Sequence, residues 1–177
     1  VRHGCSAAMC GEVWDEIYIK RIQRGEEFFN TRQLGAISDD LALLAHFFER
    51  PWLQPATTLP EDRHGLLLHH VGFDLRELGR LNEAAEILDA ALAAYTRIGA
   101  WQRATRAAGH LSNLYQTLGE LAKAEDLARK SLELAERVDD DFERMRRLAA
   151  LGSALHQRGQ VPEAMAALDQ AEQLQRG

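Results

Sequence analysis

The stretch LGRLNEA at residues 78–84 recurs as LGELAKA at 118–124 and as RGQVPEA at 158–164. The glycines at the second position of these stretches are 40 residues apart. A glycine between two apolar stretches of helical period is typical of a helix end, because glycine adopts the left-handed backbone conformation without steric cost. The recurrence therefore predicts a helical hairpin that is copied along the chain.

Apolar residues on both sides of each glycine are spaced three or four positions apart, as on one face of a helix. Pro162 fits a helix that begins after Gly159, since a proline in the first helical turn loses no hydrogen bond. We therefore expect each unit to be a pair of packed antiparallel helices. Around the first glycine the apolar residues are Leu68, Val71, Leu75 and Leu78, then Ala84, Leu88, Ala91 and Tyr95.

Small side chains recur at fixed offsets from each glycine. They are needed where two paired helices cross, because larger side chains would push the helices apart. This pattern resembles the tetratricopeptide repeat (TPR) family. The residues that carry the resemblance are Gly72, Gly79, Ala84, Leu88 and Ala91; Ser112, Gly119, Ala124, Ala128 and Ser131; and Gly152, Gly159, Ala164, Leu168 and Ala171.

The units depart from the usual form of that family in length and in one aromatic position. The usual unit has about 34 residues, so a 40-residue spacing implies longer helices. Leu75 and Leu155 replace an aromatic residue that only Tyr115 keeps. The longer unit is similar to the arrays in bacterial regulators and in the sensor regions of signal-transduction ATPases.

The resemblance implies an all-α fold. We expect a right-handed α-solenoid of antiparallel helix pairs with an irregular helical N-terminal cap. The cap and a proline-rich connector are predicted at residues 1–60, and the hairpins at about 61–99, 100–139 and 140–177.

The first 60 residues lack the repeat and are rich in aromatic side chains. A helical stripe formed by Val13, Trp14, Ile17, Tyr18 and Ile22 is expected to end near Gly25. Phe28, Phe29 and Leu34 indicate a short second helix. Residues 38–40 are expected to cap a third helix at 41–48, whose apolar face is Leu41, Leu44, Ala45 and Phe48.

The segment at residues 51–60 holds Pro51, Pro55 and Pro60 and cannot stay helical. We expect an ordered strap whose Trp52 and Leu53 are anchored on neighbouring helices, followed by a helix that starts near Pro60. The aromatic residues of this third are expected to cover the open end of the first hairpin. A ligand-binding aromatic box is the alternative.

Charge and composition disfavour several function classes. A net charge of −6 argues against direct nucleic-acid binding, which needs clustered basic residues. The basic run Arg144, Arg146 and Arg147 is expected to be a solvated helix face, as are acidic residues such as Glu125 on the second helices.

No secretory or membrane-spanning stretch stands out, so we expect a cytoplasmic protein with no membrane contact. Because the sequence begins with Val1, we expect a piece of a larger multidomain protein.

The sequence offers no catalytic motif, and we predict neither an enzyme nor a cofactor. His64, His69 and His70 form the densest histidine group, but neighbouring helical residues diverge by about 100°, so no metal site is predicted. Cys5 and Cys10 are expected on different faces of one helix, which disfavours a disulfide. A small-molecule enzyme is expected only if the aromatic N-terminal third encloses a pocket with converging polar groups.

In the TPR family the first helix of each pair lines a concave groove in which peptides lie. The resemblance therefore implies a protein- or peptide-binding interaction or sensor module. Arg106 and Asn113 stand where the family's peptide binders carry a carboxylate-gripping base and a backbone-gripping amide. The predicted groove residues are His69, Phe73, Arg76, Arg106, His110, Asn113, Gln116, Arg146, Ser153 and His156.

Two alternatives to a binding groove stay open. The groove side chains would have no binding role if they are only the solvated faces of amphipathic helices. The whole array would be a structural scaffold or self-association segment if its apolar ends bury against a neighbouring domain or a second copy in a homodimer.

Overall fold

The protein is described by a computed structural model that covers residues 7–25, 29–138 and 140–176. The chain divides into two compact units, Val1–Ile87 and Leu88–Gly177. The boundary falls within α4 (Leu81–Arg97), so this helix begins in the first unit and ends in the second. The predicted division into a cap and three hairpins stays a prediction.

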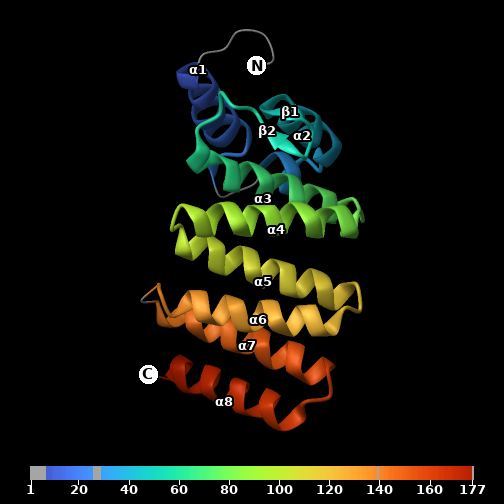
Figure 1. Ribbon diagram of the computed structural model, residues 1–177, viewed down its shortest axis with the longest axis vertical. Helices are drawn as coiled ribbons and strands as arrows, with labels where there is room; N and C mark the ends of the chain where they lie inside the picture. Colours follow the sequence, from blue (N-terminus) through green and yellow to red (C-terminus); the bar gives the residue numbers. More distant parts are fainter. Residues whose placement is uncertain (1–6, 26–28, 139, 177) are drawn as a thin grey trace. The chain divides into compact units, whose positions relative to one another are not determined.

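The repeat region is helical, and in the second unit consecutive helices form antiparallel pairs (Figure 1). Each helix begins four residues after the preceding one ends, except that α7 begins six residues after the end of α6, so the connections are short. The helices are α3 (Glu61–Glu77), α4 (Leu81–Arg97), α5 (Trp101–Thr117), α6 (Leu121–Ala135), α7 (Asp141–Gln157) and α8 (Val161–Arg176).

The repeated glycines close the first helix of each pair, as the sequence predicts. Gly79, Gly119 and Gly159 have φ values of 75°, 77° and 78°, in the left-handed region. In each turn the residue after the glycine donates its N–H to a carbonyl five residues earlier, for example Arg80 to Leu75 at 2.9 Å. Gly99, which precedes α5, adopts the same conformation with a φ of 70°, although the repeat pattern does not single it out.

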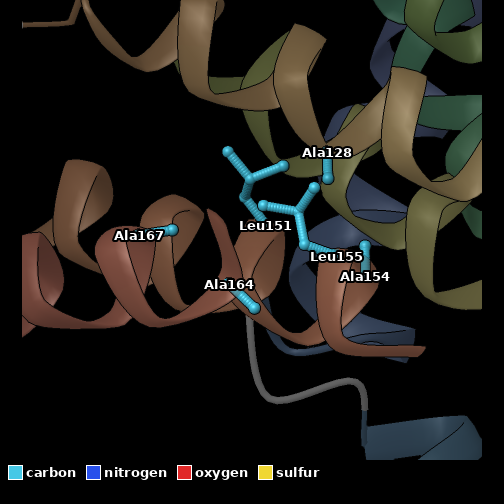
Figure 2. Close-up of a cluster of buried hydrophobic side chains, with 6 residues drawn as sticks. All are labelled: Ala128, Leu151, Ala154, Leu155, Ala164 and Ala167. Atoms are coloured by element: carbon cyan, nitrogen blue, oxygen red, sulfur yellow. The ribbon is translucent and has the colours of Figure 1, made fainter. Parts of the chain in front are cut away.

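Apolar side chains of α6, α7 and α8 form one buried cluster in the second unit. Leu151 and Leu155 of α7 pack there with Ala128 of α6 and with Ala164 and Ala167 of α8 (Figure 2). Gly152 is required at this crossing, since a Cβ atom there would lie 2.8 Å from Leu168 Cγ and 3.2 Å from the Ala164 carbonyl. Small residues therefore set the helix spacing.

Two buried hydroxyl groups in the second unit bond to the backbone of the helix they face. Ser112 donates to the Ala124 carbonyl at 2.7 Å, and Ser131 donates to the Thr105 carbonyl at 2.7 Å. These serines occupy small-residue positions of the repeat. They fill the crossing of α5 and α6 and satisfy their own hydroxyl groups, which burial would otherwise penalise.

The first unit begins with α1 (Ala7–Glu12), which continues into the π-helical segment η1 (Val13–Ile22). The wider π turns place Trp14, Tyr18 and Gln23 inside, at spacings of four and five residues. The prediction that Ile17 faces the core was wrong: its side chain is exposed, because a 3.6-residue period does not apply here.

A second π-helical segment, η3 (Phe29–Gln33), stands where a short second helix was expected. Leu34, which was expected within that helix, follows its end and is exposed. Phe28 lies outside the described residues. The third helix, α2 (Ile37–Leu44), is followed by the 3₁₀ turn η4 (Ala45–Phe47).

The prediction that residues 38–40 cap α2 was wrong. The helix begins at Ile37, and Ala36 precedes it without a side-chain cap. Asp40 therefore lies inside the first turn, where its buried carboxylate accepts hydrogen bonds from other elements. Leu41 and Leu44 of the predicted apolar face are buried, but the helix ends at Leu44 and not at the predicted Phe48, which is buried outside the helix.

The proline-rich segment forms part of a small β-hairpin. Strand β1 (Phe48–Arg50) pairs antiparallel with β2 (Gln54–Pro55) across a turn at residues 51–53. Trp52 has a φ of 64°, and its ring packs edge-on against Phe48 at 5.4 Å between centroids. Leu53 is 79% exposed, so the predicted anchoring of this residue on a helix was wrong.

Candidate functional site

Helices α5 and α7, each the first helix of its pair, lie in contact in the second unit. They run in the same direction, since Arg106 contacts Glu143 and Gln116 contacts Ser153, both 37 residues further along. We call the surface that carries these contacts the α5/α7 face. Its side chains come from Arg106, His110, Asn113 and Gln116 of α5, and from Glu143, Arg146, Ser153 and Gln157 of α7.

One end of this face holds three arginines around a single carboxylate, which we call the arginine cluster. Arg106 Nε lies 3.3 Å from Glu143 Oε1, and Arg146 Nη1 lies 3.4 Å from the same oxygen. Arg147 Nη2 lies 3.3 Å from Glu143 Oε2. Glu143 is 2% exposed, so its charge is withdrawn from water and balanced by the guanidinium groups.

Arg147 is the buried member of the cluster, with a side chain 6% exposed. Burial lowers the pKa of its guanidinium, although Glu143 opposes that shift. The prediction that the basic run is a solvated face was wrong for Arg147. The physical reason is Gly109 of α5, whose missing side chain leaves the space that the guanidinium occupies.

The other two arginines are accessible to a ligand. Arg106 and Arg146 are 43% and 47% exposed, and each directs only one nitrogen to Glu143. Within the described residues no other carboxylate pairs with either side chain, so the cluster holds two positive charges in excess. Phe142, which is 63% exposed, lies beside Arg146 with its ring 5.8 Å from the guanidinium carbon.

The other end of the face is uncharged. The Gln116 side-chain carbonyl accepts hydrogen bonds from Gln157 Nε2 at 2.9 Å and from Ser153 Oγ at 3.4 Å. The structure thus brings the predicted residues Gln116 and Ser153 together. These amides and hydroxyls offer donors and acceptors of the kind a peptide backbone needs.

Between the two ends, α5 carries His110 and Asn113. Asn113 is exposed, and His110 is half-buried and engaged by other residues. His156 is exposed on α7. The remaining predicted residues, His69, Phe73 and Arg76, belong to α3 in the first unit, where Arg76 pairs with Glu77 and covers the Phe73 ring at 4.7 Å.

The family model of the tetratricopeptide repeat matches residues 64–137 and 102–177, which together are more than half of the chain. The chain belongs to the tetratricopeptide repeat family. TPR domains are generally protein-interaction modules, and no enzyme family is evident for this one. A comparison with curated proteins gives no match.

Several solved structures are similar to this TPR chain. Podosopora anserina kinesin light chain TPR-like repeats give a TM-score of 0.66 at 20% identity, covering 82% of this chain and 70% of that one. MamA gives 0.64 at 16% identity, covering 96% and 86%. BtubC from P. vanneervenii gives 0.61 at 15% identity, and the chain spans 63% of its length. At these identities the likeness shows the fold alone.

The histidines and cysteines that the sequence singles out outside the groove lie in the first unit of the TPR chain. Among the described residues, no three His, Cys, Asp or Glu side chains group so that they could hold a metal ion. His64 contacts the Leu59 carbonyl at 3.0 Å, and His70 is buried. Cys10 is buried as a free thiol, and Cys5 lies outside the described residues. In the described parts of the chain, no helix is long and apolar enough to cross a bilayer.

Sequence reasoning missed four residues of the site, and outside the site it wrongly predicted one acidic residue to be solvated. The missed residues are Phe142, Glu143, Arg147 and Gln157. The available signal for Glu143 was its place three residues after Asp140, which caps α7 by accepting the Glu143 N–H at 3.1 Å. Glu125 of α6 is buried rather than solvated. Burial alone would raise its pKa, but hydrogen bonds from Arg129 and Arg158 hold the pKa below its ordinary value.

Proposed function

We propose that the α5/α7 face of this TPR domain binds an extended, acidic segment of a partner protein. The single observation that carries the proposal is the arginine cluster: two accessible guanidinium groups are held by a buried carboxylate and retain excess positive charge. The coarser role, a protein-interaction module, follows from the family. The acidic ligand and its position are our proposal.

The arginine cluster is suited to a carboxylate ligand. Glu143 fixes one nitrogen of Arg106 and one of Arg146, which leaves the remaining N–H groups of these half-exposed planar side chains to donate to a second acceptor. Because Arg147 keeps Glu143 buried and paired, a ligand carboxylate would join the cluster without displacing the internal one. Phe142 offers an apolar surface beside that position.

The uncharged end supports the extended form of the ligand. Asn113, Ser153 and Gln157 are exposed polar side chains along the two helices. Such groups can replace the water that a peptide backbone loses on binding, so that the ligand's N–H and C=O groups are not left unsatisfied. The proposed ligand is therefore a peptide with an acidic residue at one end, whose backbone follows α5 and α7.

The test begins with a displayed library of random peptides selected against the intact protein. Enrichment of acidic peptides is expected, and the isolated binders are then measured against a folded Arg106→Ala/Asn113→Ala variant. A loss of affinity of about tenfold or more, corresponding to about 1.4 kcal/mol, is expected. Selection of peptides without acidic residues, or unchanged affinity in the folded variant, would contradict the proposal.

A second candidate function, self-association, is favoured by the surface of α8. Val161, Met165 and Leu168 are exposed at spacings of four and three residues, so they form an apolar stripe on one side of this helix. Ala128, at the position of α6 that corresponds to Leu168, is buried against α7. Sedimentation of the wild type and of a Met165→Glu/Leu168→Glu variant tests this candidate. A concentration-independent monomer in both would remove it.

The wider setting is also a proposal. We infer that the domain is an interaction or sensor module of a larger, cytoplasmic, non-catalytic protein. What supports this is the family's general role in binding other proteins. The finer kinship to bacterial regulators and to sensor regions of signal-transduction ATPases stays a prediction from the 40-residue spacing of the glycines.

A further inference from the structure

Two buried carboxyl groups meet inside the first unit, far in sequence from the α5/α7 face. Asp40 of α2 is fully buried, and Asp74 of α3 is 2% exposed. Helices α2 and α3 are in contact, and the two side chains lie within hydrogen-bonding reach of each other. In the described part of the chain, neither carboxyl group forms an ion pair with a basic residue. We call Asp40 and Asp74 the carboxyl pair.

Asp40 is the acceptor of the pair. Its Oδ2 accepts hydrogen bonds from the Tyr18 hydroxyl and from Gln23 Nε2, both at 2.8 Å. Its Oδ1 accepts from Asn30 Nδ2, also at 2.8 Å. These neutral donors come from η1, η3 and the residue after η1, and Asp40 lies in the first turn of α2, where the helix dipole favours negative charge.

The surroundings of Asp74, unlike those of Asp40, disfavour a negative charge. Asp74 lies near the C-terminal end of α3, where the helix dipole disfavours a negative charge. Its Oδ2 atom is buried without a hydrogen-bond partner. Burial, the charge of Asp40 and the hydrogen bond to Asp40 together raise the pKa of Asp74 from 3.8 to about 9. A neutral Asp74 has an O–H to donate, whereas an ionised one has none.

We infer that the carboxyl pair holds one proton, donated by Asp74 to Asp40, and that this proton fastens α2 to α3 as a pH-sensitive latch of the N-terminal unit. When the proton leaves, two adjacent carboxylates remain buried, and neither forms an ion pair with an Arg or Lys of the described chain. Their repulsion favours separation of the two helices. The residues that Asp40 also binds, Tyr18, Gln23 and Asn30, would lose their common acceptor as α2 moves.

The other titratable groups around the latch are few. Tyr18 faces the pair from η1, and burial together with Asp40 raises the pKa of its hydroxyl. His70 lies one turn before Asp74 on α3 and packs edge-on against Tyr18 at 5.5 Å. Glu77 of α3 also raises the pKa of Asp74. Repulsion from the charge of Glu77 adds to the preference for a protonated Asp74.

The sign of the pH effect follows from the number of bound protons. Between about pH 4 and pH 9 the folded unit keeps the Asp74 proton, whereas the unfolded chain has released it. Stability therefore falls as pH rises through this interval, and the unfolding equilibrium constant rises about tenfold per pH unit from this group. Above about pH 9 both states are deprotonated and this contribution becomes constant.

The test compares the parent with Asp74→Asn, which keeps a donor to Asp40 and cannot ionise. Urea unfolding is followed by Trp14 fluorescence in the full chain with Trp52→Phe and Trp101→Phe, because Trp14 stacks on Tyr18 in this unit. The ratio of unfolding constants, parent over variant, is expected to rise about tenfold per pH unit between pH 5 and pH 8. His70 and Tyr18 are present in both proteins, so their titration cancels in the ratio.

Asp39→Asn is the matched control, since Asp39 is the exposed neighbour of Asp40 in α2. Its unfolding constant is expected to stay in a fixed ratio to that of the parent across the same pH range. A flat ratio for Asp74→Asn would overturn the latch.

A second readout uses the parent chain alone, in case Asp74→Asn does not fold. The infrared carbonyl band of a protonated carboxylic acid is expected at pH 7 and is expected to vanish above about pH 9. If the folded parent lacks that band at pH 7, the inference is wrong.

Discussion

The guanidinium of Arg147 in α7 occupies the space above Gly109 in α5 that a side chain would otherwise fill. A Cβ atom at Gly109 would overlap Arg147 Nη1 and would lie 3.3 Å from Cζ and 3.4 Å from Ser131 Oγ. The absence of one methyl group thus allows a charged side chain to enter the second unit and hold Glu143. The position of the arginine cluster depends on this relationship.

Gly109→Ala is expected to destabilise the protein by about 2 kcal/mol, because overpacking a close interior contact costs about this much. The loss should be visible as a lower urea midpoint. Arg147→Met is the informative partner substitution, since a flexible apolar side chain can move away from the new methyl group. In the double variant the two losses should be less than additive. Strict additivity would show that the two residues do not compete for the same space.

Glu143→Gln is expected to cost about 3 kcal/mol, because removing one partner of a buried ion pair leaves the other charge uncompensated. Arg147 would then be buried without an anion, and Arg106 and Arg146 would repel it. Glu133→Gln on α6 is a suitable control, since Glu133 is half exposed and pairs only with exposed basic residues. Urea unfolding should separate the two variants clearly. Equal small losses would argue against a role for Glu143 as the centre of the cluster.

Gly119→Ala should destabilise the turn between α5 and α6 by about 1 kcal/mol, because an alanine at a φ of 77° is strained. Gly119→Asn should lose less, since asparagine tolerates the left-handed region better than other residues. Nothing lies within 4 Å of the position where a Cβ would be placed, so crowding does not contribute. The melting temperature is expected to be lowest for the alanine variant, higher for the asparagine variant and highest for the parent with glycine. The reverse order would contradict the backbone argument.

Tyr18→Phe is expected to cost about 1 kcal/mol by removing a buried hydrogen bond. The phenylalanine ring keeps the stacking on Trp14, whose centroid lies 4.9 Å from that of Tyr18, and Gln23 remains bonded to Asp40. Thermal unfolding followed by Trp14 fluorescence measures the change. A loss as large as that of Tyr18→Ala would mean that the hydroxyl, and not the ring, holds η1 in place.

The repeat could be predicted from the sequence because its signals are local. Gly79, Gly119 and Gly159 mark turns whose hydrogen bonds lie within a few residues, and the apolar residues follow the period of an α-helix. The same reasoning failed in η1, since π turns change the period and leave Ile17 outside. A local pattern predicts structure only where the expected helix type is the one that forms.

The candidate site could be predicted only in part. Arg106 and Arg146 were predicted as groove residues because the family places ligand contacts on the first helix of each pair. The burial of Arg147 depends on a glycine 38 positions earlier in the chain, and no spacing rule connects the two. The available signal was Gly109 itself, since a glycine inside a regular helix usually has a packing reason. The carboxyl pair was missed because Asp40 was interpreted as a helix cap.

The most direct test of the proposed acidic-ligand site is the affinity of an acidic peptide, selected from the displayed library, for two charge-matched double variants. Arg106→Ala/Arg146→Ala removes the accessible half of the arginine cluster, whereas Lys130→Ala/Arg144→Ala removes two basic side chains that pair locally elsewhere. We predict at least a tenfold loss of affinity for the first variant and little change for the second, with a salt dependence that weakens only in the first. Equal losses in both variants, or none in either, would contradict a specific acidic-ligand site on the α5/α7 face.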